Sequence, residues 1–224
     1  MTRETLDHQI QDLHNNILAL GSMVEEAIIN AVNALKYRNI EAAQVIYEAD
    51  QTINRKRFDI ESAAIITIAT QQPMARDLRI LASVIDIAGE LERMGDYAKG
   101  IAQITIRLGN EPPIKPLIDI PRMADVTAGM LHRALGAFVN VDKECALSLP
   151  KEDDEVDQLY NQVYRELLTF MISDPSTIDR ATYLLWVAHN LERAADRVTN
   201  ICERTVYIAT GILDEIDVSN DEAH

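Results

Sequence analysis

Apolar residues recur every three or four positions along most of this chain of 224 residues. The first series consists of Leu6, Ile10, Leu13, Ile17, Leu20, Val24, Ile28 and Leu35. This spacing places the side chains on one face of an amphipathic helix. Similar series run from Ile53 to Ile68 and from Leu78 to Ala102, and Asn39 is a suitable N-cap for the second. The first half of the chain is therefore predicted to form three long helices.

Helix-breaking residues separate these series. Pro73 is predicted to lie in the first turn of the third helix, where proline is accepted. Residues 109–117 contain a Gly-Asn pair and three prolines, which is typical of a helix stop followed by a linker. Three more apolar series follow, with Asp142 as the expected N-cap of the fifth helix and a break at residues 173–176.

The two halves of the chain share the same order of features. The sequence LERMGD at residues 91–96 recurs as LERAAD at residues 191–196. Acidic pairs precede both motifs, and Pro73 corresponds to Pro175. We infer an internal duplication of an antiparallel three-helix bundle, giving an all-α fold of six long helices. The expected units are residues 1–112, residues 113–213, and a disordered acidic tail at residues 214–224.

The amino-acid composition favours a helical fold, and the net charge limits the kinds of partner that the protein can bind. Aromatic residues make up 5% of the chain, with 8 glycines and 7 prolines, which disfavours sheet-rich folds. A net charge of −15 repels nucleic acid and anionic lipid, but suits metal ions or basic partner surfaces. Two cysteines make no disulfide framework, which indicates a reducing compartment. We expect a cytoplasmic protein without a membrane span, attached to membranes only through partners.

Pairs of acidic residues four positions apart are the main candidate site. Their spacing places both members on one helix face, about one turn apart. They are Glu92 with Asp96 and Glu192 with Asp196 on the third and sixth helices, and Asp50 with Asn54 and Asp153 with Asp157 on the preceding helices. Like charges at this spacing repel, so a cation between the helices would stabilise them. Oxygen ligands suit magnesium, manganese, calcium or iron better than a structural Cys/His zinc site.

A solvated helix surface is the alternative for these carboxylates, with Arg93, Arg193 or Arg197 as ion-pair partners. His189 precedes Glu192 by three positions, but it reverses the Glu-x-x-His order of di-iron bundles. The sequence contains no phosphate-binding glycine loop and no paired nucleophile and base, so we expect no enzyme activity. A metal-storage bundle or metal-dependent enzyme and a plain helical scaffold remain alternatives.

Residues 72–79, with the sequence QPMARDLR, together with the two LER motifs, resemble the PhoU family over residues 3–212. The resemblance implies two three-helix bundles, a homodimer, and metal binding through one acidic motif per repeat. The metal would be divalent or multinuclear, drawn from iron, magnesium, manganese and zinc. The implied ligands are Asp50, Glu92 and Asp96 in the first half, and Asp153, Asp157, Glu192 and Asp196 in the second.

The chain departs from the family pattern at two places. Asn54 stands where the second half has Asp157, which should weaken the first site, and residues 174–177 replace the QPMARDLR stretch. The resemblance implies a negative regulator of phosphate uptake and phosphate-starvation signalling. Its partners would be the ATPase subunit of a phosphate ABC transporter and a phosphate sensor histidine kinase. Such an adaptor would act at the inner face of the membrane through these proteins.

Overall fold

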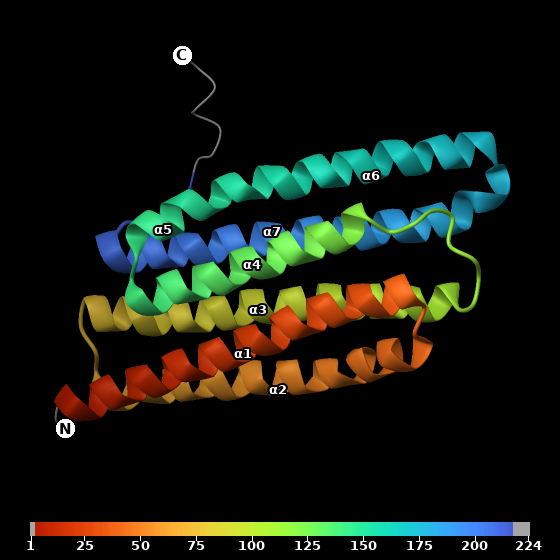
Figure 1. The fold of residues 1–224 in the computed structure, drawn as a ribbon. Helices are drawn as coiled ribbons and strands as arrows, with labels where there is room; N and C mark the ends of the chain where they lie inside the picture. Colours follow the sequence, from red (N-terminus) through yellow and green to blue (C-terminus); the bar gives the residue numbers. More distant parts are fainter. Residues whose placement is uncertain (1–2, 217–224) are drawn as a thin grey trace, which may run out of the picture.

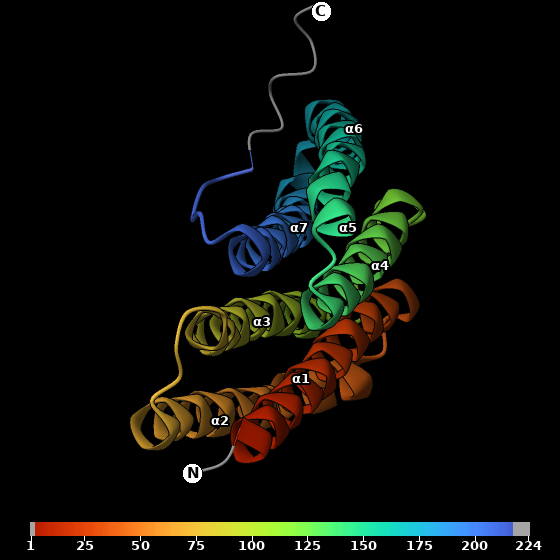
Figure 2. The ribbon, with the colours of Figure 1, turned by 90° about the vertical axis from the view of Figure 1, so that its left-hand side faces the viewer.

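The computed structural model describes residues 3–216, and each regular element in that range is a helix. Six long helices form two antiparallel three-helix bundles that lie side by side (Figures 1 and 2). The first bundle contains α1 (Arg3–Tyr37), α2 (Ile40–Gln71) and α3 (Arg76–Leu108). The second contains α4 (Asp119–Asn140), the short α5 (Lys143–Ser148), α6 (Asp153–Ser173) and α7 (Ile178–Thr210). The predicted all-α fold with a duplicated three-helix unit is confirmed.

The predicted helix ends have clear local causes. Asn39 caps α2, because its Oδ1 accepts a 2.9 Å hydrogen bond from the backbone N–H of Ala42. Gly109 follows α3 with a φ of +56°, a conformation that glycine adopts without a Cβ clash. The α6 helix ends at Ser173, and Oδ1 of Asp174 accepts a 3.0 Å bond from the Ser176 N–H. Residues 110–118 then link the two bundles.

Two predictions about helix starts were wrong. Pro73 lies in the loop before α3 and not in its first turn, because the helix begins only at Arg76. Asp142 caps a helix as expected, but this helix is α5, with only 6 residues. The 3₁₀ turn η1 (Leu149–Glu152), which contains Pro150, separates α5 from α6. Proline has no N–H to continue the α-helical bonds, so the predicted fifth helix is divided. A second 3₁₀ turn, η2 (Pro175–Thr177), joins α6 to α7.

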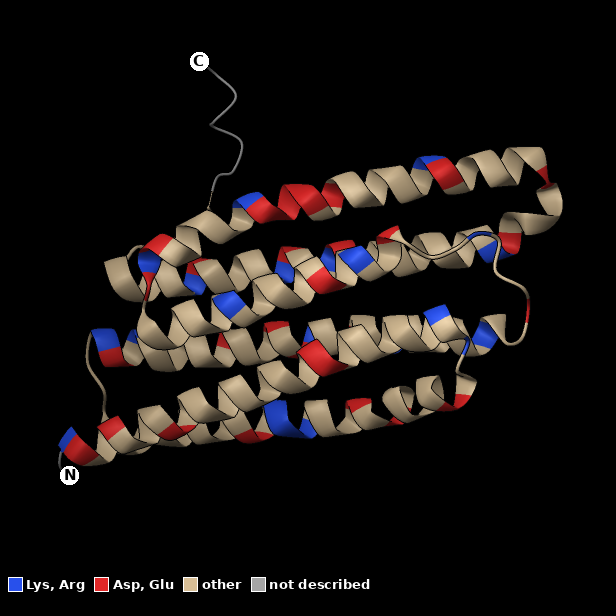
Figure 3. Ribbon diagram, in the orientation of Figure 1, with Lys and Arg blue, Asp and Glu red and all other residues tan. Residues whose placement is uncertain are grey.

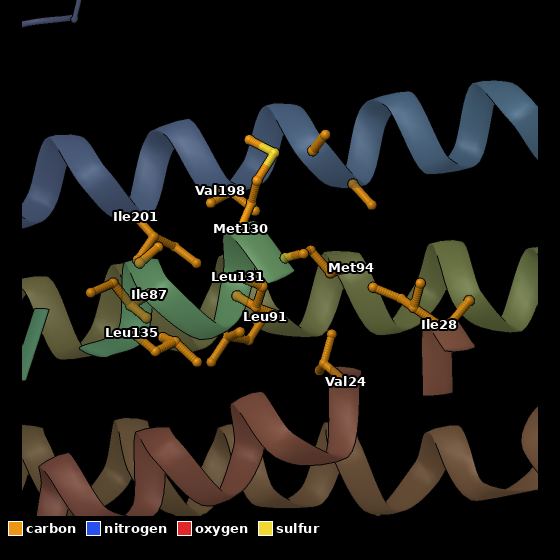
Figure 4. Close-up of a cluster of buried hydrophobic side chains, with 14 of the residues drawn as sticks. Val24, Ile28, Ile87, Leu91, Met94, Met130, Leu131, Leu135, Val198 and Ile201 are labelled. Atoms are coloured by element: carbon orange, nitrogen blue, oxygen red, sulfur yellow. The ribbon is translucent and has the colours of Figure 1, made fainter. Parts of the chain in front are cut away.

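One continuous apolar core joins the two bundles. Its inner helices are α1, α3, α4 and α7, and α2 and α6 lie on the outside (Figure 2). Figure 4 shows side chains from these four inner helices meeting, including Val24, Leu91, Met130 and Val198. Each of these four side chains is fully buried. Because the core crosses the boundary between the repeats, we expect the two bundles to unfold together.

The α3 and α7 helices pack antiparallel along the seam between the repeats. Asn200 contacts Glu90 on one side of the middle of this seam, and Asn190 faces Gly100 on the other side. A β-carbon at position 100 would lie 3.0 Å from the Asn190 amide nitrogen, so glycine permits the close approach. Since the repeats are offset by 100 residues, this pairing brings the two LER motifs to the middle of the seam.

Helix α1 corrects one expectation about membranes. By length and composition alone this helix could cross a membrane, although no membrane span was expected. Its apolar stripe is used differently here, because residues such as Ile17, Leu20 and Ile28 are fully buried against α2, α3 and α4. The start of the predicted acidic tail, residues 214–216, has no helix, and Ile216 packs on the core. Residues 217–224 of that tail lie outside the described residues.

Candidate functional site: two unequal carboxylate clusters

The first acidic cluster lies where α2 and α3 approach closely. Gly95 permits this approach, since a β-carbon there would lie 3.1 Å from Cγ2 of Ile53. On the same faces of the two helices, Asp50 comes from α2, and Glu92 and Asp96 come from α3. The structure therefore places these three predicted residues in one region, which we call the repeat-1 cluster. The pKa of Glu92 is raised by burial first, and then by the negative charge of Asp96.

A lysine already contacts two of the three carboxylates of the repeat-1 cluster. Nζ of Lys99 lies 2.7 Å from Oδ2 of Asp50, which is only 2% exposed, and 3.9 Å from Oδ1 of Asp96. The same Oδ2 accepts a 2.9 Å hydrogen bond from the Asn54 amide. The hydrogen bond to Asp50 raises the pKa of Lys99. Lys99 is thus a stable positive charge inside the group of carboxylates.

The groups around Asp96 shift the pKa of its carboxyl in opposite directions. Burial raises the pKa of Asp96, Asp50 raises it further, and the Lys99 ammonium lowers it. Arg57 acts in the same way on Glu92, where its guanidinium lowers the pKa of the carboxyl. Arg57 also forms a 2.7 Å ion pair with Glu61 on α2. The first cluster therefore has both positive and negative charges.

The second cluster has the same plan but a different charge balance. Asp153 and Asp157 come from the first turns of α6, where acidic residues gather in Figure 3, and Glu192 and Asp196 come from α7. We call these four residues the repeat-2 cluster. The pKa of Asp153 is raised to about 7, first by burial and then by the charges of Asp196, Asp157, Glu192 and Asp154. A shift of this size is typical of a carboxyl that is both buried and surrounded by other anions.

The repeat-2 cluster has polar atoms that could take a further ligand. Oδ1 of Asp153 is buried and accepts no hydrogen bond from any residue in the described range 3–216. His189, whose role was left open by the sequence, places Nδ1 3.1 Å from Oε2 of Glu192. Burial raises the pKa of Glu192, Asp196 raises it further, and His189 lowers it. His189 is therefore part of this cluster.

The two clusters differ in how far their oxygens are already used by neighbouring groups. Within residues 3–216, no three carboxylate, imidazole or thiolate groups already surround a single point closely enough to hold a metal ion. A cation at the repeat-2 cluster would therefore require side-chain rotation, and its unpaired oxygens make it a suitable ligand set. In the repeat-1 cluster, Lys99 and Asn54 already use Oδ2 of Asp50. The buried Oδ1 of Asp50 has no hydrogen-bond partner among residues 3–216, so a metal at the repeat-1 cluster would have to share Asp50 with the Lys99 ammonium.

The sequence prediction found the carboxylates but missed Lys99, Arg57 and Gly95. Lys99 follows Asp96 by three positions, a spacing at which helical side chains are neighbours, so the signal was present. Comparison of the two repeats also draws attention to Lys99, because the corresponding residue at position 199 is threonine. Gly95 next to Asp96 indicates a close helix approach, and its equivalent in the second repeat is Ala195.

Comparison with known proteins agrees with this architecture. The family model described as PhoU domain matches the chain twice, over residues 17–105 and 120–205. A phosphate-specific transport system accessory protein PhoU homolog of Clostridium acetobutylicum is 37% identical over 212 residues, covering 94% of this chain and 97% of that protein. The equivalent homolog of Aquifex aeolicus is 37% identical over 203 residues, covering 91% and 92%.

Solved structures give the same result. The crystal structure of the phosphate transport system regulatory protein PhoU from Streptococcus pneumoniae has a TM-score of 0.87 and 31% identity, and the match covers 94% of this chain and 99% of that one. PhoU from Pseudomonas aeruginosa has a TM-score of 0.87 and 33% identity, with 92% and 99% covered. The repeated helical unit, the paired acidic motifs and the full-length similarity lead to one conclusion: this chain belongs to the PhoU family.

Proposed function

We propose that this protein is an accessory regulator of phosphate transport that restrains uptake and starvation signalling when phosphate is plentiful. The observation that carries the proposal is similarity over almost the whole chain to proteins named phosphate-specific transport system accessory protein. The proposed partners are the ATPase subunit of the phosphate ABC transporter and the phosphate sensor histidine kinase. The proposed role is that of an adaptor without enzyme activity, located in the cytoplasm and reaching the inner membrane through these partners.

The outer helices offer surfaces for such partners. The α2 helix exposes large apolar side chains, and so does α6; they are Val45, Phe58, Ile65 and Ile66 on α2, and Tyr164, Leu168 and Ile172 on α6. Apolar side chains in an acidic surface favour partners with apolar and basic residues. A second copy of the chain could also cover one of these faces, as expected for a homodimer. Size-exclusion chromatography with light scattering measures that oligomeric state directly.

A deletion strain tests the regulatory proposal. A phosphate-starvation reporter should be active in high phosphate when the gene is deleted, and the wild-type gene should restore repression. A variant with Glu111→Ala, at an ion pair with Arg180 beside the linker between the bundles, should restore repression as well. Normal repression in the deletion strain would contradict the proposal. Co-purification with the transporter ATPase and the kinase, each tested separately, identifies the partner.

We also propose that the repeat-2 cluster binds a divalent or multinuclear metal. The supporting observations are its four carboxylates, the raised pKa of Asp153, and the unpaired buried Oδ1 of that residue. When bound, such a metal would link α6 to α7 and stabilise carboxylates that otherwise repel. Elemental analysis of protein purified without chelator tests this directly. Metal near zero in wild-type protein would contradict it.

A second candidate function, favoured by the same cluster, is a bundle that stores metal or uses it in catalysis. Storage requires several metal ions per chain, whereas the regulatory proposal requires only occupancy of the cluster. Catalysis requires an open coordination position for water or substrate. The deletion reporter and the elemental analysis together separate these functions: storage would give high metal content and unchanged phosphate repression on deletion.

A further inference from the structure

Three groups hold the ammonium of Lys99 inside the repeat-1 cluster. Nζ is 2.7 Å from Oδ2 of Asp50 and 3.9 Å from Oδ1 of Asp96. It also lies 5.6 Å from the ring centroid of Tyr47, in the range of a cation–π contact. Asp50 and Tyr47 lie on α2, and Asp96 and Lys99 on α3, so the ammonium links the two helices. This is the position that a bound cation would take between carboxylates of these helices.

We propose that Lys99 is the resident cation of the repeat-1 cluster, and that a mobile divalent cation binds only at the repeat-2 cluster. This inference rests on the cation binding proposed above and deepens it. The repeat-2 cluster would then hold an exchangeable metal ion and the repeat-1 cluster a lysine ammonium, although both sites derive from the same ancestral repeat. The difference lies in this chain's own residues: Lys99 and Asn54 in the first repeat stand where Thr199 and Asp157 stand in the second.

Charge and burial explain why a mobile cation cannot easily replace Lys99. The bond between Lys99 and Asp50 joins two charged groups, which makes it stronger than a neutral hydrogen bond. A divalent ion at Oδ2 of Asp50 would have to displace both this ammonium and the Asn54 amide. It would also lie close to the displaced ammonium, and like charges a few ångströms apart repel. The Lys99 ammonium, which is part of the chain, binds Asp50 without displacing another group.

The second repeat has the opposite arrangement. The four carboxylates of the repeat-2 cluster act on one another, and the residue equivalent to Arg57 is Tyr160. A neutral threonine stands at position 199, so the helix position that supplies the ammonium in the first repeat supplies none here. Nearby carboxylates without such an internal cation are the usual ligands of a hard divalent ion.

Titration of the full chain with Mn²⁺, followed by electron paramagnetic resonance and calorimetry, tests the proposal. Wild-type protein should bind one Mn²⁺ per chain. The variant Lys99→Met keeps the apolar stem and removes the charge, and it should bind two. The reciprocal variant Thr199→Lys places an ammonium at the equivalent position and should reduce binding to none. Lys36→Met, an exposed lysine on α1, is the matched control and should still bind one.

A double variant, Glu192→Gln with Asp196→Asn, locates the wild-type ion and should abolish its binding. Mn²⁺ that stays bound to this double variant, or unchanged Mn²⁺ binding by folded Lys99→Met, would overturn the role given to Lys99. If Lys99→Met does not fold, Thr199→Lys decides alone, and unchanged binding by that variant overturns the inference. Absence of Mn²⁺ binding in all variants would overturn cation binding itself, whereas the deletion reporter decides the regulatory function independently.

Discussion

Asn200 on α7 donates a 3.2 Å hydrogen bond to Oε2 of Glu90 on α3, joining the two repeats at their seam. Arg197 approaches the same oxygen at 3.5 Å, and the Glu90 side chain is only 12% exposed. Its equivalent in the second repeat is Asn190, which faces Gly100 across the other half of the seam. The duplication thus produced a symmetric helix pairing in which corresponding positions have diverged into different polar contacts.

Replacing Glu90 by alanine should weaken the contact between the repeats. The change leaves the Asn200 amide and the Arg197 guanidinium without this acceptor, and an unpaired, partly buried polar group costs about 1–3 kcal/mol. Urea unfolding followed by circular dichroism measures the loss. As a control, Glu155→Ala removes an exposed ion pair with Arg122 and should change the free energy of unfolding by at most about 1 kcal/mol. Equal effects of the two substitutions would contradict a special role for Glu90.

Periodicity was sufficient to predict the six long helices, because each of them buries one regular apolar stripe. Helix-breaking residues predicted the exact starts and ends of the helices less well. Pro73 can start a helix by its own preference, but Gln72 and Ala75 adopt positive φ values of 50° and 48°, so the chain turns before α3 begins. No break was predicted at Pro150, although its missing N–H divides the second helix of the second repeat.

The candidate site was only partly predictable for a related reason. The spacing of Glu92 and Asp96 fixes their helix face, so both members of the pair could be identified from sequence. Whether that face meets a positive charge depends on the packing of α3 against α2, which brings Lys99 to Asp50, 49 residues away. Contacts across the seam, such as that between Glu90 and Asn200, depend on the packing of the whole bundles.

Gly21 on α1 should be sensitive to a single added methyl group. A β-carbon at this buried position would lie 2.0 Å from Cδ1 of Leu135 on α4, so Leu135 would have to move within the core. Overpacking of this kind costs about 1–3 kcal/mol. Gly21→Ala should therefore lower the free energy of unfolding, as measured by urea or thermal denaturation.

Gly129 provides the matched control for Gly21→Ala. It lies in the middle of α4 and is exposed, and apart from its own stretch of helix no atom lies within 4 Å of the place that a β-carbon would take. Gly129→Ala should raise the free energy of unfolding by about 0.5–1 kcal/mol, because alanine loses less backbone entropy in a helix. Destabilisation by both substitutions would show that the close contact with Leu135 is not the cause.

The two cysteines should react at very different rates. Cys202 is fully buried in α7, and burial raises the pKa of its thiol to about 12. Cys145 on α5 is only partly buried. Since the thiolate is the reactive form, a disulfide reagent such as DTNB should modify at most Cys145 in native protein and both thiols in urea. The Cys145→Ser variant should show no native-state reaction, and rapid labelling of that variant would contradict the burial of Cys202.

His14 should make the protein less stable in mildly acidic solution. Its ring is 7% exposed and packs edge-on against Phe138 at a centroid distance of 5.2 Å. Burial lowers the pKa of His14. The unfolded chain therefore takes up a proton near the ordinary histidine pKa, while the folded protein does so only at lower pH. The contribution of His14 to stability is complete above that ordinary pKa and is lost as the pH falls toward the folded value.

The variant His14→Leu removes this titration and should flatten the dependence of stability on pH. Compared with wild type, its free energy of unfolding should improve as the pH is lowered from 8 to 5, because neither of its states takes up the proton. His8→Leu, at an exposed position on the same helix, is the control and should follow the wild-type curve. Parallel curves for wild type and His14→Leu over this pH range would mean that His14 can be protonated without leaving its contact with Phe138.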